Sequence, residues 1–156
     1  MSRAFRDALG MFATGVTVVS AAGEDGEPFG LTVASFNSVS LDPPLVLFSI
    51  DRDALSLPAL RRAPGYGISV LSATQVDVSK LFATTGAEKW AGMELEIGYG
   101  GAPLIPDAIA GFECRPYAVY DGGDHEIFVG EVVAYRSAPE AAPLVFFGGN
   151  YRSLAS

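Results

Sequence analysis

The sequence predicts a mainly β fold in which antiparallel strands form a barrel with a few covering α-helices. Many short to medium runs of β-branched and aromatic residues are separated by turn residues, as in Gly23-Glu24-Asp25-Gly26 and Asp121-Gly122-Gly123-Asp124. Strand and helix patterns do not alternate along the chain, which disfavours a doubly wound parallel sheet. These patterns alone indicate a closed barrel, and the 156 residues fit a single domain over 1–156.

The strand predictions rest on runs of Val, Ile, Phe, Tyr and Thr that are bounded by Gly, Pro or Asp. The run at 44–50 is apolar on both faces, which is typical of a central strand. The glycine-rich stretch from Gly86 to Pro106 predicts a loop with one short strand near 94–98. The other strands are expected at 15–21, 29–35, 66–71, 109–120, 125–136 and 144–147.

Three short helices are expected, one before the first strand and two between later strands. Ser2 predicts the N-cap of a helix that runs to about Phe12. The apolar residues of this helix recur at helical spacing, so we expect one face to be buried over an open end of the sheet. Those residues are Phe5, Ala8, Leu9 and Phe12.

The other two helices have similar start and stop signals. Asp53 predicts the N-cap of a helix over 54–62, and Pro64-Gly65 marks its end. Thr74 predicts the start of a helix over 75–83.

Composition excludes several classes of function. The net charge of −8 and the lack of a basic run argue against a nucleic-acid partner. One cysteine, Cys114, and one histidine leave neither a disulfide framework nor a cluster with metal-ligand spacing, so no metal site is predicted. No run is long enough to span a bilayer, and residues 8–22 predict a strand rather than a signal peptide. We therefore expect no membrane partner and a reducing, cytoplasmic location, and the 49% of apolar residues predicts a subunit interface.

The single histidine, His125, stands at the entrance of an alternating apolar strand. Ile127 and Val129 share its face of the strand, while Glu126 and Phe128 share the other face. His125 is therefore expected at the rim of the surface that this strand lines. One interpretation is a catalytic or orienting imidazole, and the other is a histidine that caps the sheet and hydrogen-bonds a loop.

A second distinctive stretch runs from Gly30 to Pro44 and is rich in small residues and hydroxyls. Such a segment can offer backbone N–H and C=O groups, together with hydroxyls, to a flat heteroaromatic ligand. An edge strand whose Ser and Thr residues face water would show the same composition. The residues by themselves leave both interpretations open.

Taken together, these stretches resemble the flavin reductase-like family of the FMN-binding split-barrel fold, which includes the reductase components of two-component flavin-dependent monooxygenases. The resemblance covers nearly the whole chain. It is strongest at Thr32 to Pro44, which ends in Ser-x-Asp-Pro-Pro, and at Gly123-Asp124-His125. The implied fold is an antiparallel split β-barrel.

The resemblance also implies an activity and a set of partners. The chain would be an NAD(P)H-dependent flavin reductase that reduces FMN or FAD and supplies the reduced flavin to a separate monooxygenase. NADH or NADPH would be the hydride donor, and the protein would be a homodimer with flavin near the interface. The alternative within this fold is a protein that binds or stores flavin without reductase turnover.

The family's site residues are carried over position by position. His125 would be the catalytic residue that orients the nicotinamide or hydrogen-bonds the reduced ring. The phosphate would lie near Asp51 and Arg52, where the chain departs from the family by having Asp53-Ala54-Leu55 and keeping only Ser56. Lys89 would supply further positive charge, with a solvated loop lysine as the alternative. The remaining flavin or nicotinamide contacts would be Thr32, Ala34, Ser35, Phe36, Ser38, Ser40, Phe82 and Tyr151.

Overall fold

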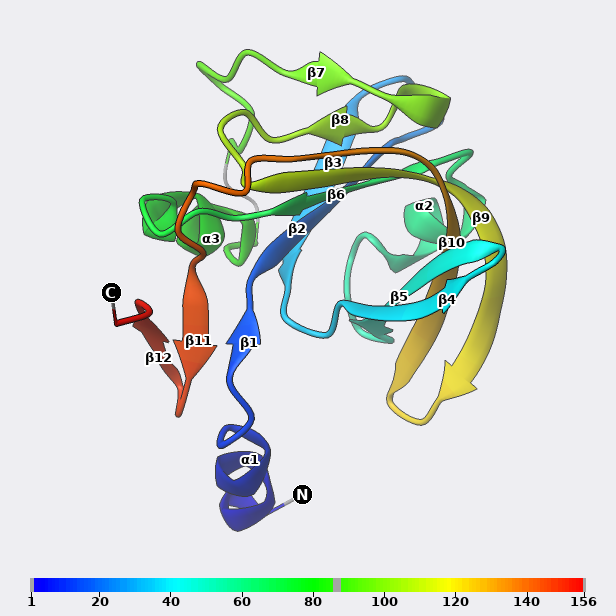
Figure 1. Cartoon of the computed structure of the whole chain (residues 1–156). Helices are drawn as coiled ribbons and strands as arrows, with labels where there is room; N and C mark the ends of the chain where they lie inside the picture. Colours follow the sequence, from blue (N-terminus) through cyan, green and yellow to red (C-terminus); the bar gives the residue numbers. More distant parts are fainter. Residues whose placement is uncertain (1, 86–87, 156) are drawn as a thin grey trace.

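The computed structural model describes residues 2–85 and 88–155, and a seven-stranded antiparallel sheet forms its main body (Figure 1). Residues 86 and 87, at the start of the predicted loop, lie outside the described residues. In spatial order the strands are β3 (Pro28–Val33), β2 (Thr17–Ala22), β6 (Tyr66–Val70), β9 (Ala110–Gly122), β10 (His125–Ser137), β5 (Pro44–Asp51) and β4 (Asn37–Leu41).

The sheet curls but does not close. Its two end strands, β3 and β4, do not pair with each other in the described part of the chain. The split barrel is thus confirmed, whereas the closed barrel indicated by local patterns is wrong. The reason is that residues 34–36 leave β3 and lead into β4, a strand that the sequence did not predict separately and that pairs only with β5.

Two hydrophobic cores lie on opposite faces of β2, which is buried along most of its length. Val19 points into the first core, inside the curve of the sheet, and Val18 points into the second. Phe48 and Phe128 stack in the first core with their ring centroids 5.4 Å apart. β2 is therefore packed on both faces, and β5, which the sequence predicts as a central strand, lies between β10 and β4.

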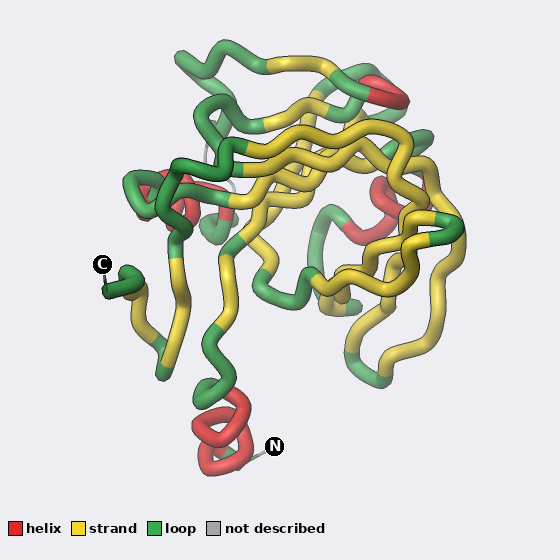
Figure 2. Tube along the Cα trace, viewed as in Figure 1, coloured by secondary structure: helices red, strands yellow, loops and turns green. Residues whose placement is uncertain are grey.

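Two smaller sheets complete the fold. β1 (Thr14–Gly15), β11 (Val145–Phe147) and β12 (Asn150–Arg152) form one of them, and β12 was not predicted. β7 (Glu96–Ile97) and β8 (Pro103–Leu104) form the other, with the 3-10 turn η1 (Tyr99–Gly101) between them. The tube view in Figure 2 shows that strands and loops dominate and that the helices are short.

The first helix, α1 (Arg3–Leu9), begins where the sequence predicts. Ser2 is its N-cap, and its side chain accepts a hydrogen bond of 3.3 Å from the backbone N–H of Phe5. The expected burial of one face is wrong, because α1 buries none of its residues and extends away from the sheet (Figure 1). Leu9 and Phe12 remain 59% and 78% exposed. Helical spacing predicted an apolar face, but the neighbouring strands of the same chain do not reach it.

The other helices start later than predicted. α2 (Leu57–Arg62) has Ser56 at its N-cap, and its first turn contains Pro58, a residue well suited to that position. Asp53 is not the cap, because its own N–H donates to the Asp51 carboxylate at 2.7 Å and closes a turn.

α3 (Val76–Phe82) has Gln75 at its N-cap. Thr74 does not open this helix, because its hydroxyl bonds that of Ser72. The Gln75 amide instead accepts from the Ser72 N–H and donates to the carbonyl of Pro106. None of the helices described is long and apolar enough to cross a membrane.

Candidate functional site

A cavity of about 560 Å³ lies between β3, the loop before α2 and the end of α3. Its walls contain residues that pack in both hydrophobic cores. Phe29 and Leu31 pack on the first core, and Phe82 and Trp90 pack in the second. Its lining consists of Pro28, Phe29, Gly30, Leu31, Thr32, Ala54, Leu55, Ser56, Phe82, Ala83, Thr84, Thr85, Glu88, Lys89 and Trp90.

The β3 wall is held to its neighbours at two positions. The Thr32 hydroxyl donates a 2.6 Å hydrogen bond to the backbone carbonyl of Ser79 and so ties β3 to α3. At Gly30, a Cβ atom would lie only 3.1 Å from the Ser20 hydroxyl and 3.2 Å from the Trp90 ring. Glycine thus lets Trp90 approach the strand closely enough to form the adjoining wall.

The opposite wall is aromatic and carries a positive charge. Phe82 is almost fully buried and meets Trp90 edge to face, with ring centroids 4.7 Å apart. The Lys89 ammonium lies 5.8 Å from the Phe82 ring centre and donates to the carbonyl of Gly30 at 3.4 Å. Partial burial lowers the pKa of Lys89 from its ordinary value. The wall therefore offers a flat apolar surface with an ammonium group beside it.

Four of the predicted cofactor residues meet in this cavity. Thr32, Ser56, Phe82 and Lys89 come from separate segments and all line it. The sequence reasoning missed the apolar walls made by Phe29 and Leu31. The alternation of large side chains in β3 was visible, but only the tertiary structure shows that residues 28–32, from both faces of this strand, line a cavity.

The hydroxyl-rich segment after β3 does not line this cavity. The Ser35 hydroxyl accepts from the N–H of Ser49 at 2.9 Å and donates to the Ser49 carbonyl, so it fastens the turn to β5. Phe36 stacks on Phe112 with ring centroids 5.5 Å apart, beside the first core. The other predicted residues of this segment are Ala34, in the exposed turn, and Ser38 and Ser40, on β4.

Tyr151 also lies away from the cavity lining. It is in β12, and its hydroxyl pairs with that of Ser79 at 2.7 Å. Its ring meets Phe146 edge to face. Ser79 accepts the Thr32 hydrogen bond through its carbonyl, so Tyr151 supports the cavity wall from behind.

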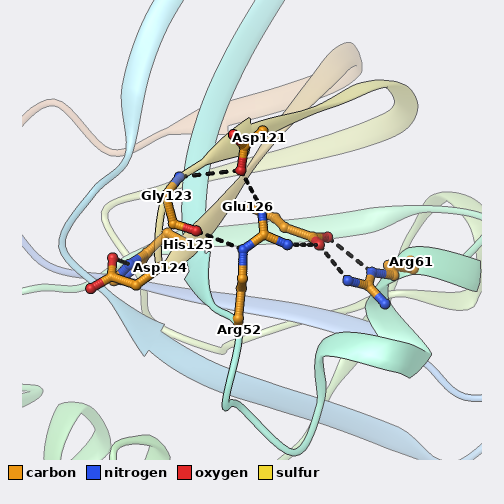
Figure 3. A network of polar contacts seen from close by, with 7 residues as sticks. All are labelled: Arg52, Arg61, Asp121, Gly123, Asp124, His125 and Glu126. Atoms are coloured by element: carbon orange, nitrogen blue, oxygen red, sulfur yellow. Dashed lines mark hydrogen bonds and ion pairs between the residues drawn. The ribbon is translucent and has the colours of Figure 1, made fainter.

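Arg52 is committed to the hairpin that carries His125 (Figure 3). Its Nε donates to the carbonyl of Gly123 at 2.7 Å, and its two terminal nitrogens pair with Asp121 and Glu126. Glu126 also pairs with Arg61 of α2. The hydrogen bond from Arg61, reinforced by the charge of Arg52, lowers the pKa of the Glu126 carboxyl despite its burial. The network joins the end of β5, α2 and the hairpin tip.

His125 is half exposed at the first position of β10, as its place in the sequence predicts. Its Nδ1 lies 2.7 Å from the Asp124 carboxylate (Figure 3). This hydrogen bond lowers the pKa of Asp124. Because an ionised carboxylate only accepts, Nδ1 carries the proton of this hydrogen bond, and Nε2 takes no part in it.

The hairpin tip and the cavity meet through the loop before α2. Asp51 stands opposite His125 in the sheet register, and the N–H of Arg52 donates to the carbonyl of Asp124 at 2.9 Å. Only two residues after Arg52, Ala54 begins the stretch that lines the cavity. His125 therefore stands beside the same loop whose next residues line the cavity.

Comparison with known proteins assigns the family. A sequence model of the flavin reductase like domain matches residues 9–155. The chain belongs to the flavin reductase-like family. An NADH-dependent FMN reductase of Agrobacterium fabrum, SmoA, is 48% identical over 152 residues, which is 96% of this chain and 84% of that protein.

Solved structures of this flavin reductase-like family have the same fold. The Streptomyces globisporus NADH:FAD oxidoreductase SgcE6, in complex with NAD and FAD fragments, matches with a TM-score of 0.91 at 41% identity, over 97% of this chain and 91% of that one. BorF, the flavin reductase component of a bacterial two-component tryptophan halogenase, matches with a TM-score of 0.92 at 38% identity, over 100% and 99% of the two chains.

The residues of the cavity suit a flavin. Its aromatic and aliphatic walls match a flat ring system, and the hydroxyls of Thr32 and Ser56 offer hydrogen bonds. Lys89 provides a positive charge for a phosphate. Within residues 2–85 and 88–155, no three His, Cys, Asp or Glu side chains are grouped so as to hold a metal ion.

Proposed function

We propose that this chain is an NADH-dependent flavin reductase that reduces FMN or FAD and delivers the reduced flavin to a separate monooxygenase. The observation that carries the proposal is a cavity with aromatic walls, hydroxyls and an ammonium group, in a chain of the flavin reductase-like family. The relatives supply the choice of hydride donor, since SmoA and SgcE6 are both named as NADH-dependent.

The protein's own residues bind and orient the two cofactors. Thr32, Ser56 and Lys89 hold the flavin in the cavity, with Phe82 and Trp90 as its apolar floor. When bound, flavin accepts a hydride from the dihydronicotinamide, and this chemistry belongs to the cofactors. His125 orients the nicotinamide through Nε2, and Asp124 holds the imidazole in the tautomer that leaves Nε2 free to accept.

The remaining predicted contacts have indirect roles in this proposal. Ser35 and Phe36 shape the turn that follows β3, and Arg52 holds the hairpin tip. Asp51 stands opposite His125 and shapes the turn before α2 through its carboxylate. Contacts from Ala34, Ser38, Ser40 and Tyr151 to a flavin stay predictions.

A homodimer is part of the proposal. The face of α1 and the segment after it expose Phe5, Leu9, Met11 and Phe12, and a second copy of the chain would cover them. Sedimentation of the purified chain measures the number of subunits directly. A single domain over 1–156 and a cytoplasmic location also stay predictions.

The test is NADH oxidation by the purified protein, followed by absorbance with no flavin, with FMN and with FAD. Turnover that depends on added flavin supports the reductase. A tightly held yellow flavin without turnover would instead support the alternative, a protein that binds or stores flavin.

His125→Ala tests the proposed role of the imidazole. Loss of one orienting hydrogen bond should lower kcat about tenfold and leave the Kd for flavin nearly unchanged. Equal losses in kcat and in flavin affinity would assign His125 a structural role only.

A further inference from the structure

A second cavity, of about 600 Å³, continues from the first. The two share four lining residues, which are Pro28 and Phe29 of β3 and Leu55 and Ser56 of the loop before α2. Because the shared residues come from both walls, the cavities follow one another along the same groove. A ligand that fills the first cavity can therefore extend past Phe29 and Leu55 into the second.

The second cavity has a different chemistry from the first. Beyond the shared residues it is lined by the β2–β3 turn, which contributes Glu24, Asp25 and Glu27, and by Ala59 and Arg62 of α2. Arg62 is already paired with Glu24 at 2.6 Å, so the carboxylates outweigh the positive charge. Asp25 accepts a hydrogen bond from the backbone N–H of Glu27, which orders the turn.

This charge selects the kind of group that the cavity accepts. Carboxylates repel a phosphate at short range, so an anionic group is excluded. They accept hydrogen bonds from hydroxyl and amino groups, as acidic side chains do with the ribose of dinucleotides. Phe29 adds an aromatic surface on which a purine can stack. A neutral nucleoside meets all of these conditions.

We propose that the second cavity binds the adenosine half of FAD, and that this chain therefore prefers FAD to FMN. The inference rests on the proposed function, which puts the flavin ring in the first cavity. The diphosphate would lie at the junction, near Ser56, whose side chain makes no capping hydrogen bond to α2. FMN has no adenosine and would leave the second cavity unused.

Ala59→Trp is the decisive variant. Ala59 lines the second cavity and is not part of the first, so an indole there fills the adenosine space alone. In wild type, calorimetry should give a Kd for FAD about tenfold lower than that for FMN. In the variant the Kd for FAD should rise about tenfold, to the FMN value, while the Kd for FMN stays the same. Unchanged FMN binding also shows that the variant is folded.

Ala83→Trp is the matched control. Ala83 follows α3 and lines only the first cavity, so the same substitution there should weaken FMN and FAD binding together. Equal affinities of wild type for FMN and FAD, or an Ala59→Trp effect that is equal for both flavins, would overturn the inference.

The adenosine of NADH is the competing occupant, and the KM for NADH measured with FMN as acceptor distinguishes it. An unchanged value in Ala59→Trp supports FAD, whereas a raised value with unchanged FAD binding overturns the proposal. Failure of the proposed function has a different signature, because flavins would then bind without NADH turnover. Calorimetry still reports the FAD preference in that case.

Discussion

The wall of the first cavity and the tip of the β9–β10 hairpin both belong to the proposed site, yet they are stabilised by different interactions. The wall depends on buried packing, chiefly Phe82 against Trp90. The tip depends on ion pairs that Arg52 makes at the protein surface (Figure 3). Packing is insensitive to salt and mild acid, whereas surface ion pairs are weakened by both.

The two regions therefore respond differently to solution conditions. The cavity that binds the flavin is built into the core and keeps its shape. The hairpin that carries His125 is tied to the loop before α2 and to α2 itself by the half-exposed Arg52 and Arg61, which pair with the exposed Asp121 and the buried Glu126. Solution conditions should therefore affect the placement of His125 before they affect the cavity.

The largest expected effect is that of Phe82→Ala. Removing a buried aromatic side chain leaves a hole beneath the cavity wall, so the free energy of unfolding should fall by about 3–5 kcal/mol. Urea denaturation measures this loss, which should be the same at low and high salt. The control is Thr85→Ala, an exposed residue of the same cavity lining, which should change the unfolding free energy by less than about 0.5 kcal/mol. A loss for Phe82→Ala as small as the control's would mean that the wall is not held by packing.

Glu126→Gln should lower the unfolding free energy by less than Phe82→Ala does, because both guanidinium partners of Glu126 remain in contact with water. The hydrogen bond from Arg61 lowers the pKa of the Glu126 carboxyl in the folded state below its ordinary value of 4.5. Between these two pKa values the unfolded chain binds more protons than the folded one. The ion pairs therefore stabilise the fold fully above about pH 4.5, and this contribution is lost as the pH falls through the folded pKa.

Urea denaturation in steps below pH 4.5 checks this prediction. The unfolding free energy of Glu126→Gln should fall less steeply on acidification than that of wild type. Glu131→Gln is the control, because Glu131 lies on the same strand and pairs with Arg115 at 3.2 Å. If the unfolding free energies of wild type and Glu126→Gln fell equally steeply below pH 4.5, the pair with Arg61 would contribute nothing to stability.

The smallest effect is expected for Asp121→Asn. Asp121 is 82% exposed, so its pair with Arg52 should be worth only about 0.2–1 kcal/mol. The amide oxygen of Asn can still accept from the N–H of Gly123, which keeps the turn intact. The loss of unfolding free energy should vanish in 1 M salt, where the screening length is about 3 Å. If the loss of unfolding free energy persisted at high salt, the pair of Asp121 with Arg52 would be as insensitive to salt as the packing of the cavity wall.

Much of the local structure could be predicted from local signals. The long hairpin, its Gly-Asp turn and the position of His125 at the start of β10 follow from alternation and turn chemistry. Ser2 caps α1 as its residue type predicts. These features depend on neighbours in the sequence, so a single sequence contains the information that specifies them.

Local patterns and the family resemblance thus predict the β-rich fold, the family and four residues of the first cavity. The contacts of Arg52 could not be predicted locally, because its guanidinium binds a hairpin whose residues lie about seventy positions away. Only the tertiary structure decided that α1 stays uncovered by its own chain and that two cavities join at Phe29 and Leu55. Each of these outcomes depends on which distant segments meet, and that is set by strand register and by the packing of the two cores rather than by local propensity.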